Sequence, residues 1–333
     1  MKKIVAIILS AIFGCAIFLH AENMKDIVEY AATMNDTTDD SVYIERLNKL
    51  NTTMEMTYNK DVRAKIERYA NRQQATVSYV LGASKYYFPI FEKALKENDM
   101  PVELRYLPAI ESTLKPKAIS RRGAAGLWQM KAITAREQGL KINSLVDERL
   151  DVYKSTESAL HYLRFLYKFF DDNWTLAIAA YNCGPTAISR AIRRANGSND
   201  FWKIRKFLPK ETRDYVPTFI AMVYIMNYYQ EHGITPDDTD LPSTCDRIMT
   251  SHNISLRQIS DYCNWDYTYL KKLNPRYRTE LIPGEKEPSP ICLPREDMEF
   301  FIAKEDSICK FNTDKYFKKG KVSTRHKRWR RRR

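Results

Sequence analysis

The sequence predicts a mainly α protein, in which an all-helical domain is followed by a small α+β module. Apolar residues recur at helical spacing in several segments, as in the stripe formed by Leu163, Leu166 and Phe170. Few alternating runs occur before residue 240, and the 333-residue chain contains only 10 glycines. A segment rich in proline and aspartate, residues 236–243, reads as a linker. We therefore expect helices packed around one core over residues 59–235.

Residues 1–21 have the composition of a secretory signal peptide. Two lysines precede an apolar stretch from Ile4 to Leu19, and Ala21 is a small residue suited to cleavage. A retained membrane anchor is the alternative, because the apolar stretch is close to the shortest length that spans a bilayer. Residues 22–58 are polar and rich in Asp and Thr, so we expect them to form a loose lead-in.

The first candidate for chemistry is Glu111. Pro101 suits the first turn of a helix, and Glu111 follows Leu107 by four residues on the apolar stripe of that helix. Burial should raise the pKa of this carboxyl toward the range in which it donates a proton near neutral pH. Because no second acid stands in a comparable position, the arrangement suits general-acid cleavage of a glycosidic bond without a carboxylate nucleophile. The alternative is a structural glutamate that caps a helix or pairs with Arg105.

Two polar clusters could hold a polar polymer against this acid. The first is the small-residue turn 120–126, which is followed by Trp128 and Gln129, an aromatic surface beside an amide. The second ends a helical stripe at Tyr181 and Asn182, just before a Gly-Pro helix stop and restart. Taken singly, each cluster is also compatible with ordinary packing.

Together these elements resemble the lytic transglycosylase family that has the goose-lysozyme-like SLT domain, and within it the membrane-bound lytic murein transglycosylase D type. The resemblance covers about residues 85 to 230 and implies a lysozyme-like, all-helical catalytic domain. The motifs that carry it are Tyr86-Tyr87-Phe88-Pro89, Leu104 to Ser112, Gly123 to Gln129, Val146-Asp147-Glu148-Arg149, Ala180 to Gly184 and Glu211 to Pro217. The sequence departs from the family pattern after Gln129, where Lys131 replaces an apolar residue and puts the shape of one sugar subsite in doubt.

The resemblance implies a peptidoglycan lytic transglycosylase in which Glu111 is the catalytic acid and then the base. Tyr181 would hydrogen-bond and orient Glu111, and Ser112 would contact the muramoyl group. Gln129, Asn182 and Tyr215 would bind the substrate.

Two other functions stay open. The first is a goose-type muramidase, a hydrolase that would need a positioned water and a second acid, for which the candidates are Asp147, Glu148 and Asp151. The second is a non-catalytic peptidoglycan-binding protein, to which only Lys131 points.

Residues 244–295 read as a short strand, two helices and a closing strand, with Ile248 and Met249 in the first strand and Ile291 to Pro294 in the last. This order resembles a LysM peptidoglycan-binding module, although the usual Gly-Asp-Thr opening is missing. The alternative is a small appendix that only packs on the catalytic domain.

Residues 296–333 form a C-terminal extension that ends in a basic tail. Residues 315–333 contain 11 Lys or Arg and no Asp or Glu, whereas the whole chain has a net charge of +13. Such a tail favours an anionic membrane surface as a partner without specific binding of nucleic acid, and a solvated tail without a partner is the alternative. With the signal peptide, it predicts a protein of the cell envelope that is periplasmic and associated with the membrane.

Metal and cofactor chemistry find no support in the sequence. The 5 histidines are scattered without zinc-ligand spacing, and no Gly-rich phosphate loop or Gly-x-Ser-x-Gly elbow occurs, so we expect no metal and no cofactor. Beyond the signal segment lie five cysteines, of which Cys183 is the only one before the linker. An oxidising compartment would allow the other four to pair, in an order that the sequence does not give.

Overall fold

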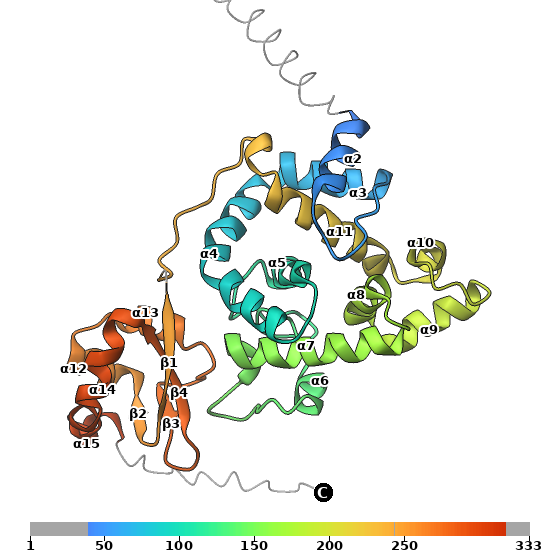
Figure 1. Cartoon of the computed structure of the whole chain (residues 1–333). Helices are drawn as coiled ribbons and strands as arrows, with labels where there is room; N and C mark the ends of the chain where they lie inside the picture. The colour runs from blue at the N-terminus through green and yellow to red at the C-terminus, as the bar shows by residue number, and fades with distance from the viewer. Residues whose placement is uncertain (1–38, 243, 318–333) are drawn as a thin grey trace, which may run out of the picture.

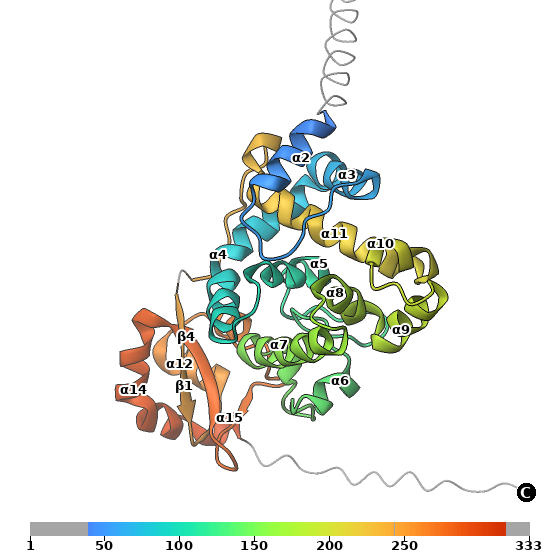
Figure 2. The same cartoon turned by 45° about the vertical axis from the view of Figure 1, so that its right-hand side comes forward.

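The computed structural model describes residues 39–242 and 244–317. The expected signal peptide, the first part of the lead-in and nearly all of the basic tail lie outside the described residues. Figures 1 and 2 show a helical domain and, beside it, a smaller module that contains all the strands found in the described part of the chain. The predicted mainly α architecture followed by a small α+β module is therefore confirmed.

The helical domain runs from residue 40 to residue 232. Its elements in chain order are α2 (Asp40–Lys49), α3 (Lys60–Glu67), the π-helical turn η1 (Arg68–Arg72), α4 (Gln74–Glu97), the 3-10 helix η2 (Val102–Tyr106), α5 (Leu107–Ser112), α6 (Ala132–Glu137), η3 (Glu148–Leu150), α7 (Val152–Phe169), α8 (Trp174–Cys183), α9 (Pro185–Arg194), α10 (Phe201–Ile204), η4 (Arg205–Phe207), α11 (Lys210–Asn227) and η5 (Gln230–His232).

The core of this domain is arranged around α8. Five consecutive residues of α8, Leu176 to Ala180, are at most 1% exposed, so this helix is covered on all sides. The helices α7, α9 and α11 contact it, and small alanine side chains let these neighbours approach closely. The stripes predicted for α7, α8 and α11 face this core.

The lead-in is not loose over its described part, which corrects the expectation for residues 39–58. Asp39 caps α2, and Tyr43 and Leu47, one turn apart on this helix, are buried. The Tyr43 ring lies 5.5 Å from the Tyr224 ring of α11, and Arg46 donates a 2.8 Å hydrogen bond to the Tyr224 hydroxyl. The polar composition of the whole segment concealed this short amphipathic helix.

The C-terminal module consists of two antiparallel two-stranded sheets and the helices that cover them. Its elements are β1 (Cys245–Thr250), β2 (Asn253–Ser255), α12 (Leu256–Cys263), α13 (Tyr267–Leu273), β3 (Leu281–Pro283), β4 (Ser289–Pro294), α14 (Arg295–Lys310) and α15 (Thr313–Tyr316). Strand β1 pairs with β4 so that Ile248 faces Ile291, and β2 pairs with β3 so that Ile254 faces Ile282.

The module extends beyond the expected boundary at residue 295. Phe301 and Ile308 of α14 are fully buried in a second hydrophobic core, together with Leu256, Ile259 and other side chains of the module. The expected order of strand, two helices and strand is present, with the additional pair β2–β3 and with α14 as a third covering helix. The start of the C-terminal extension is therefore part of the module.

The module is in direct contact with the helical domain. Val146 pairs with Tyr277 in an isolated β-bridge, and the Arg278 amide donates a 2.9 Å hydrogen bond to the Leu145 carbonyl. The linker is also in contact, since the Asp237 amide donates a 2.9 Å hydrogen bond to the Ser78 carbonyl of α4. Among the described residues no helix is both long enough and apolar enough to cross a membrane.

Candidate active site

Glu111 lies in the last turn of α5, at a groove of about 830 Å³. Pro108 stands in the first turn of this helix, and Thr113 ends it in the left-handed conformation with φ of 52°. The expected single helix from Pro101 is instead the 3-10 helix η2 followed by α5, and both elements present their apolar faces to the core. The groove is lined by residues of α5, of the segment 120–131, of the end of α8 and of the start of α11.

The environment of Glu111 fits a proton donor. Burial raises the pKa of its carboxyl to about 7, and the nearby Glu211 carboxylate acts in the same direction. The hydroxyl of Tyr215 donates a hydrogen bond to Oε1 of Glu111 and lowers the pKa, but this effect is smaller than that of burial. A carboxyl with a pKa in this range can both donate and accept a proton near neutral pH, as a group that first gives and then takes a proton requires.

The hydrogen-bond partner of Glu111 is Tyr215 and not Tyr181, which corrects the role expected for Tyr181. The Tyr181 hydroxyl donates a 2.7 Å hydrogen bond to the carbonyl of Trp128. Tyr181 still lines the groove. Burial is the main cause of the raised pKa of its phenol, and the nearby Glu111 charge raises it further. Both tyrosines occupy suitable helical positions, and the sequence does not reveal which hydroxyl reaches the acid.

Gln129 and Asn182 line the groove as expected. Gln129 adopts the left-handed conformation with φ of 48°, and its Nε2 donates hydrogen bonds to the carbonyls of Gly126 at 2.8 Å and Ala118 at 3.1 Å. The Asn182 Oδ1 accepts a 2.8 Å hydrogen bond from the hydroxyl of Thr212, a partner that the sequence analysis did not identify. Each amide is thus held by a neighbour while it borders the groove.

Ser112 does not line the groove, which contradicts the expected contact with substrate. Its side chain is buried, with 6% of the residue exposed, and its hydroxyl donates a 2.9 Å hydrogen bond to the Pro108 carbonyl one turn earlier in α5. The helical period explains the result, because adjacent residues of a helix point about 100° apart and Glu111 already faces the groove.

The second acids considered for a hydrolase lie elsewhere. Asp147, Glu148 and Asp151 are buried at the contact with the C-terminal module, where arginine side chains pair with all three. The other carboxylates that line the groove are Glu211, which is 3.9 Å from Arg122, and Asp214, which pairs with Lys65 at 2.9 Å. Desolvation raises the pKa of the Glu111 carboxyl, whereas the pKa of Asp214 is lowered, because its contacts with Lys65 outweigh desolvation.

Comparisons with known proteins agree with this geometry. Residues 88–204 match the family described as the transglycosylase SLT domain, and residues 244–310 match the LysM-like domain of lytic transglycosylase MltD. The chain is 32% identical over 241 residues to membrane-bound lytic murein transglycosylase D of Escherichia coli strain K12, a similarity that covers 72% of this chain and 52% of that protein.

Two further similarities cover smaller parts. The soluble lytic murein transglycosylase of Salmonella typhimurium is 32% identical over 117 residues, which are 33% of this chain and 18% of the relative. The crystal structure of the 70 kDa soluble lytic transglycosylase SLT70 from Escherichia coli aligns with a TM-score of 0.38 and 26% identity, over 45% of this chain and 25% of that chain.

The chain spans about half the length of the membrane-bound relative that it matches. Residues 88–204 belong to the transglycosylase SLT domain family, and residues 244–310 to the LysM-like domain family of lytic transglycosylase MltD.

Proposed function

We propose that this protein is a peptidoglycan lytic transglycosylase, which cleaves the β-1,4 bond between N-acetylmuramic acid and N-acetylglucosamine without water. The observation that carries the proposal is the partly buried carboxyl of Glu111, whose pKa desolvation raises to about 7, in a groove of the SLT domain. The other two carboxylates of the groove have cationic neighbours, so the arrangement favours a mechanism with a single acid.

In this mechanism the protonated Glu111 donates its proton to the glycosidic oxygen, and the bond from that oxygen to C1 of the muramoyl sugar breaks. The carboxylate then accepts the proton of the C6 hydroxyl of the same sugar, whose oxygen bonds to C1 and closes a 1,6-anhydro ring. The proton balance of Glu111 is restored at the end of the cycle. Tyr215 stabilises the ionised carboxylate between the two steps through its hydrogen bond.

We assign substrate binding to the residues that border the groove beside the acid. Gln129 and Asn182 would contact the acetamido and hydroxyl groups of the glycan, and Tyr181 would support them by holding the Trp128 carbonyl. Their restraint by neighbouring groups supports this assignment, because a fixed amide loses less entropy when it binds.

We also assign the glycan strands as the ligand of the LysM-like module and the cell envelope as the site of action. These assignments rest on the two domain families and on the similarity to a membrane-bound relative. The basic tail, whose residues 318–333 lie outside the described part of the chain, would add attraction to an anionic membrane surface.

Mass spectrometry of products released from purified peptidoglycan tests the function directly. Muropeptides with 1,6-anhydro ends are the expected result. Reducing ends would instead identify a goose-type hydrolase, and the absence of products from folded protein would identify a binding protein.

A further inference from the structure

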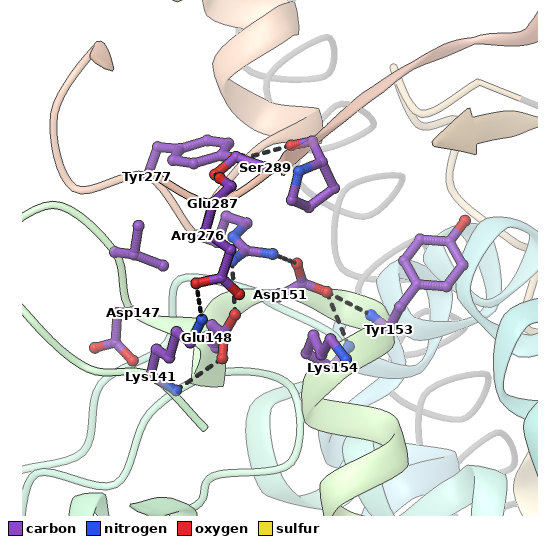
Figure 3. Close-up of polar contacts among 12 residues, drawn as sticks. Lys141, Asp147, Glu148, Asp151, Tyr153, Lys154, Arg276, Tyr277, Glu287 and Ser289 are labelled. Carbon is purple, nitrogen blue, oxygen red and sulfur yellow. Dashed lines mark hydrogen bonds and ion pairs between the residues drawn. The ribbon is translucent and has the colours of Figure 1, made fainter. Parts of the chain in front are cut away.

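Buried charges connect the LysM-like module to the helical domain. Arg276 of the module lies between two carboxylates of the helical domain, with its NH1 2.7 Å from Oδ2 of Asp151 and its NH2 2.7 Å from Oε1 of Glu148 (Figure 3). Arg278 reaches a third carboxylate, since its NH2 is 2.8 Å from Oδ2 of Asp147. We call these five residues the junction cluster. All except Arg278 are at most 8% exposed.

The first path from the junction cluster to the groove passes through Arg149. Asp147 accepts hydrogen bonds from Nε of Arg149 at 3.0 Å and from its NH2 at 2.8 Å, so this carboxylate holds two arginines at once. The remaining NH1 of Arg149 donates to the carbonyls of Gly123 at 2.8 Å and Met130 at 3.3 Å. Arg149 therefore fixes both ends of the segment that contains Gln129.

The second path passes through α7. Oδ1 of Asp151 caps this helix by accepting hydrogen bonds from the amides of Tyr153 and Lys154 at 3.0 and 2.9 Å, as Figure 3 shows. One turn further along α7, the hydroxyl of Thr156 accepts a 2.9 Å hydrogen bond from Nε1 of Trp128. The Trp128 carbonyl in turn accepts the hydroxyl of Tyr181, so this path also ends at the groove.

Both paths meet in residues 120–131, which we call the groove loop. The loop packs closely on the backbone of Arg149, because a Cβ at Gly126 would stand 1.8 Å from the Arg149 carbonyl oxygen. Several residues of the loop line the groove, among them Arg122, Gln129 and Lys131. Hydrogen bonds between charged groups are directional, so these ion pairs restrict the arrangement of the groove loop.

We propose that Arg276 and Arg278 of the LysM-like module are positioning residues of the catalytic domain, which hold the groove loop in its substrate-binding conformation. The module then has a role in catalysis that is separate from binding to the wall. The inference rests on the proposed function, because the loop is assigned there to the glycan. It requires that Arg276 and Arg278, which lie more than 30 residues beyond the linker, act on the groove through Asp147, Arg149 and Asp151.

The test compares Arg278→Met and Arg276→Met with the unchanged protein in the full-length chain, with a soluble glycan fragment as substrate. We expect each substitution to raise KM about fivefold while kcat changes less, because the loop binds substrate and Glu111 lies on α5. The pH at which the rate falls should stay the same, since no junction residue contacts Glu111. Arg276→Lys keeps the positive charge but lacks the planar guanidinium that bonds two carboxylates. Its KM should therefore lie between those of Arg276→Met and the unchanged protein.

The control is Arg295→Met. Arg295 pairs with Asp246 at 2.7 Å in a more exposed ion pair, whose two residues both belong to the module. This control should leave KM unchanged. Arg278 is the milder test of the two, because its side chain is 44% exposed and loses a single ion pair, so the variant should fold even if Arg276→Met does not.

Hydrogen exchange separates this inference from the proposed function. Faster exchange of amides in residues 120–131 of Arg278→Met, with no change in Arg295→Met, supports the positioning role even if the protein shows no turnover. An unchanged KM together with unchanged exchange in the loop would overturn the inference, and a lowered melting temperature alone would show that the cluster only stabilises the fold.

Discussion

The hydroxyl of Tyr215 on α11 donates a hydrogen bond to Oε1 of Glu111 on α5, and this bond joins the two helices beside the groove. It opposes the effect of burial on the acid, since a bond to the charged form favours ionisation. The pKa of about 7 is therefore a balance between a desolvated site and a single phenolic donor. Substitutions that remove the phenolic donor or a nearby charge should therefore shift the pKa of Glu111 in a predictable direction.

Glu111→Gln should abolish cleavage of peptidoglycan while the fold and the binding of wall material persist. The amide keeps the shape and can still accept from Tyr215, but it cannot donate the proton that the leaving oxygen needs. Turnover is measured by release of soluble muropeptides, and folding by circular dichroism. A rate reduced only a few fold would show that another group supplies the proton.

The rate should decline as pH rises through about 7, because the acid form of Glu111 is then lost. Tyr215→Phe removes the bond that lowers this pKa, so the decline should move to higher pH. Glu211→Gln removes a nearby negative charge that raises the pKa, so the decline should move to lower pH, by less because the Glu211 side chain is 72% exposed. Profiles of kcat/KM against pH check both signs, and shifts in the same direction for both variants would contradict the assignment.

The raised pKa also has a consequence for stability. The folded-state pKa of about 7 exceeds the ordinary value of 4.5, so ionisation of Glu111 costs the folded state stability as pH rises from 4.5 to about 7. Glu111→Gln removes this cost, which is up to about 3 kcal/mol above that window and absent below it. Urea unfolding at about pH 8 and pH 4 should therefore show a more stable variant only at the higher pH. If the variant were more stable by the same amount at both pH values, its stability would come from packing and not from the removed charge.

The basic tail gives a separate prediction. Deletion of residues 318–333 should weaken binding to anionic lipid vesicles, because each cation near such a surface contributes about 1 kcal/mol. Added salt should reduce the difference, since the attraction is screened over roughly 8 Å at physiological ionic strength. Cosedimentation with vesicles at low and high salt measures this, with neutral vesicles as control. Equal binding of both proteins at low salt would exclude a membrane-binding role.

The sequence was sufficient for the parts that depend on periodic patterns. The stripes of α7, α8 and α11 and the order of strands and helices in the module follow from spacing, and Glu111 is found at the groove. The sequence does not identify the partner of Glu111. Tyr181 lies in the last turn of α8 and Tyr215 in the second turn of α11, and only the packing of the two helices decides which hydroxyl reaches the acid.

Two other features depend on contacts between distant parts of the chain. The acids Asp147, Glu148 and Asp151 are candidates for a hydrolase in the sequence, because Arg276, which pairs with both Glu148 and Asp151, comes 125 or more residues later. Ser112 is expected to contact substrate because it follows Glu111 in the sequence. Adjacent residues of a helix point about 100° apart, however, so the Ser112 side chain faces the core.

The groove loop provides the last prediction, because two of its glycines have similar positive φ angles but different surroundings. Gly123 has φ of 76° and Gly126 has φ of 84°, so alanine is strained at both positions. An added Cβ at Gly126 would stand 1.8 Å from the Arg149 carbonyl oxygen, whereas at Gly123 nothing lies within 4 Å. Gly123→Ala should then cost about 1 kcal/mol of unfolding free energy, as backbone strain alone does.

Gly126→Ala should cost several times more, because the backbone at Arg149 cannot yield without moving the buried pair of Arg149 and Asp147. It should also raise KM, since the loop that carries Gln129 is displaced from the junction. Thermal unfolding and kinetics on a soluble glycan fragment measure both effects, with Gly123→Ala as the matched control. If the two variants lost the same stability, the close contact between the groove loop and Arg149 would not be part of the folded protein.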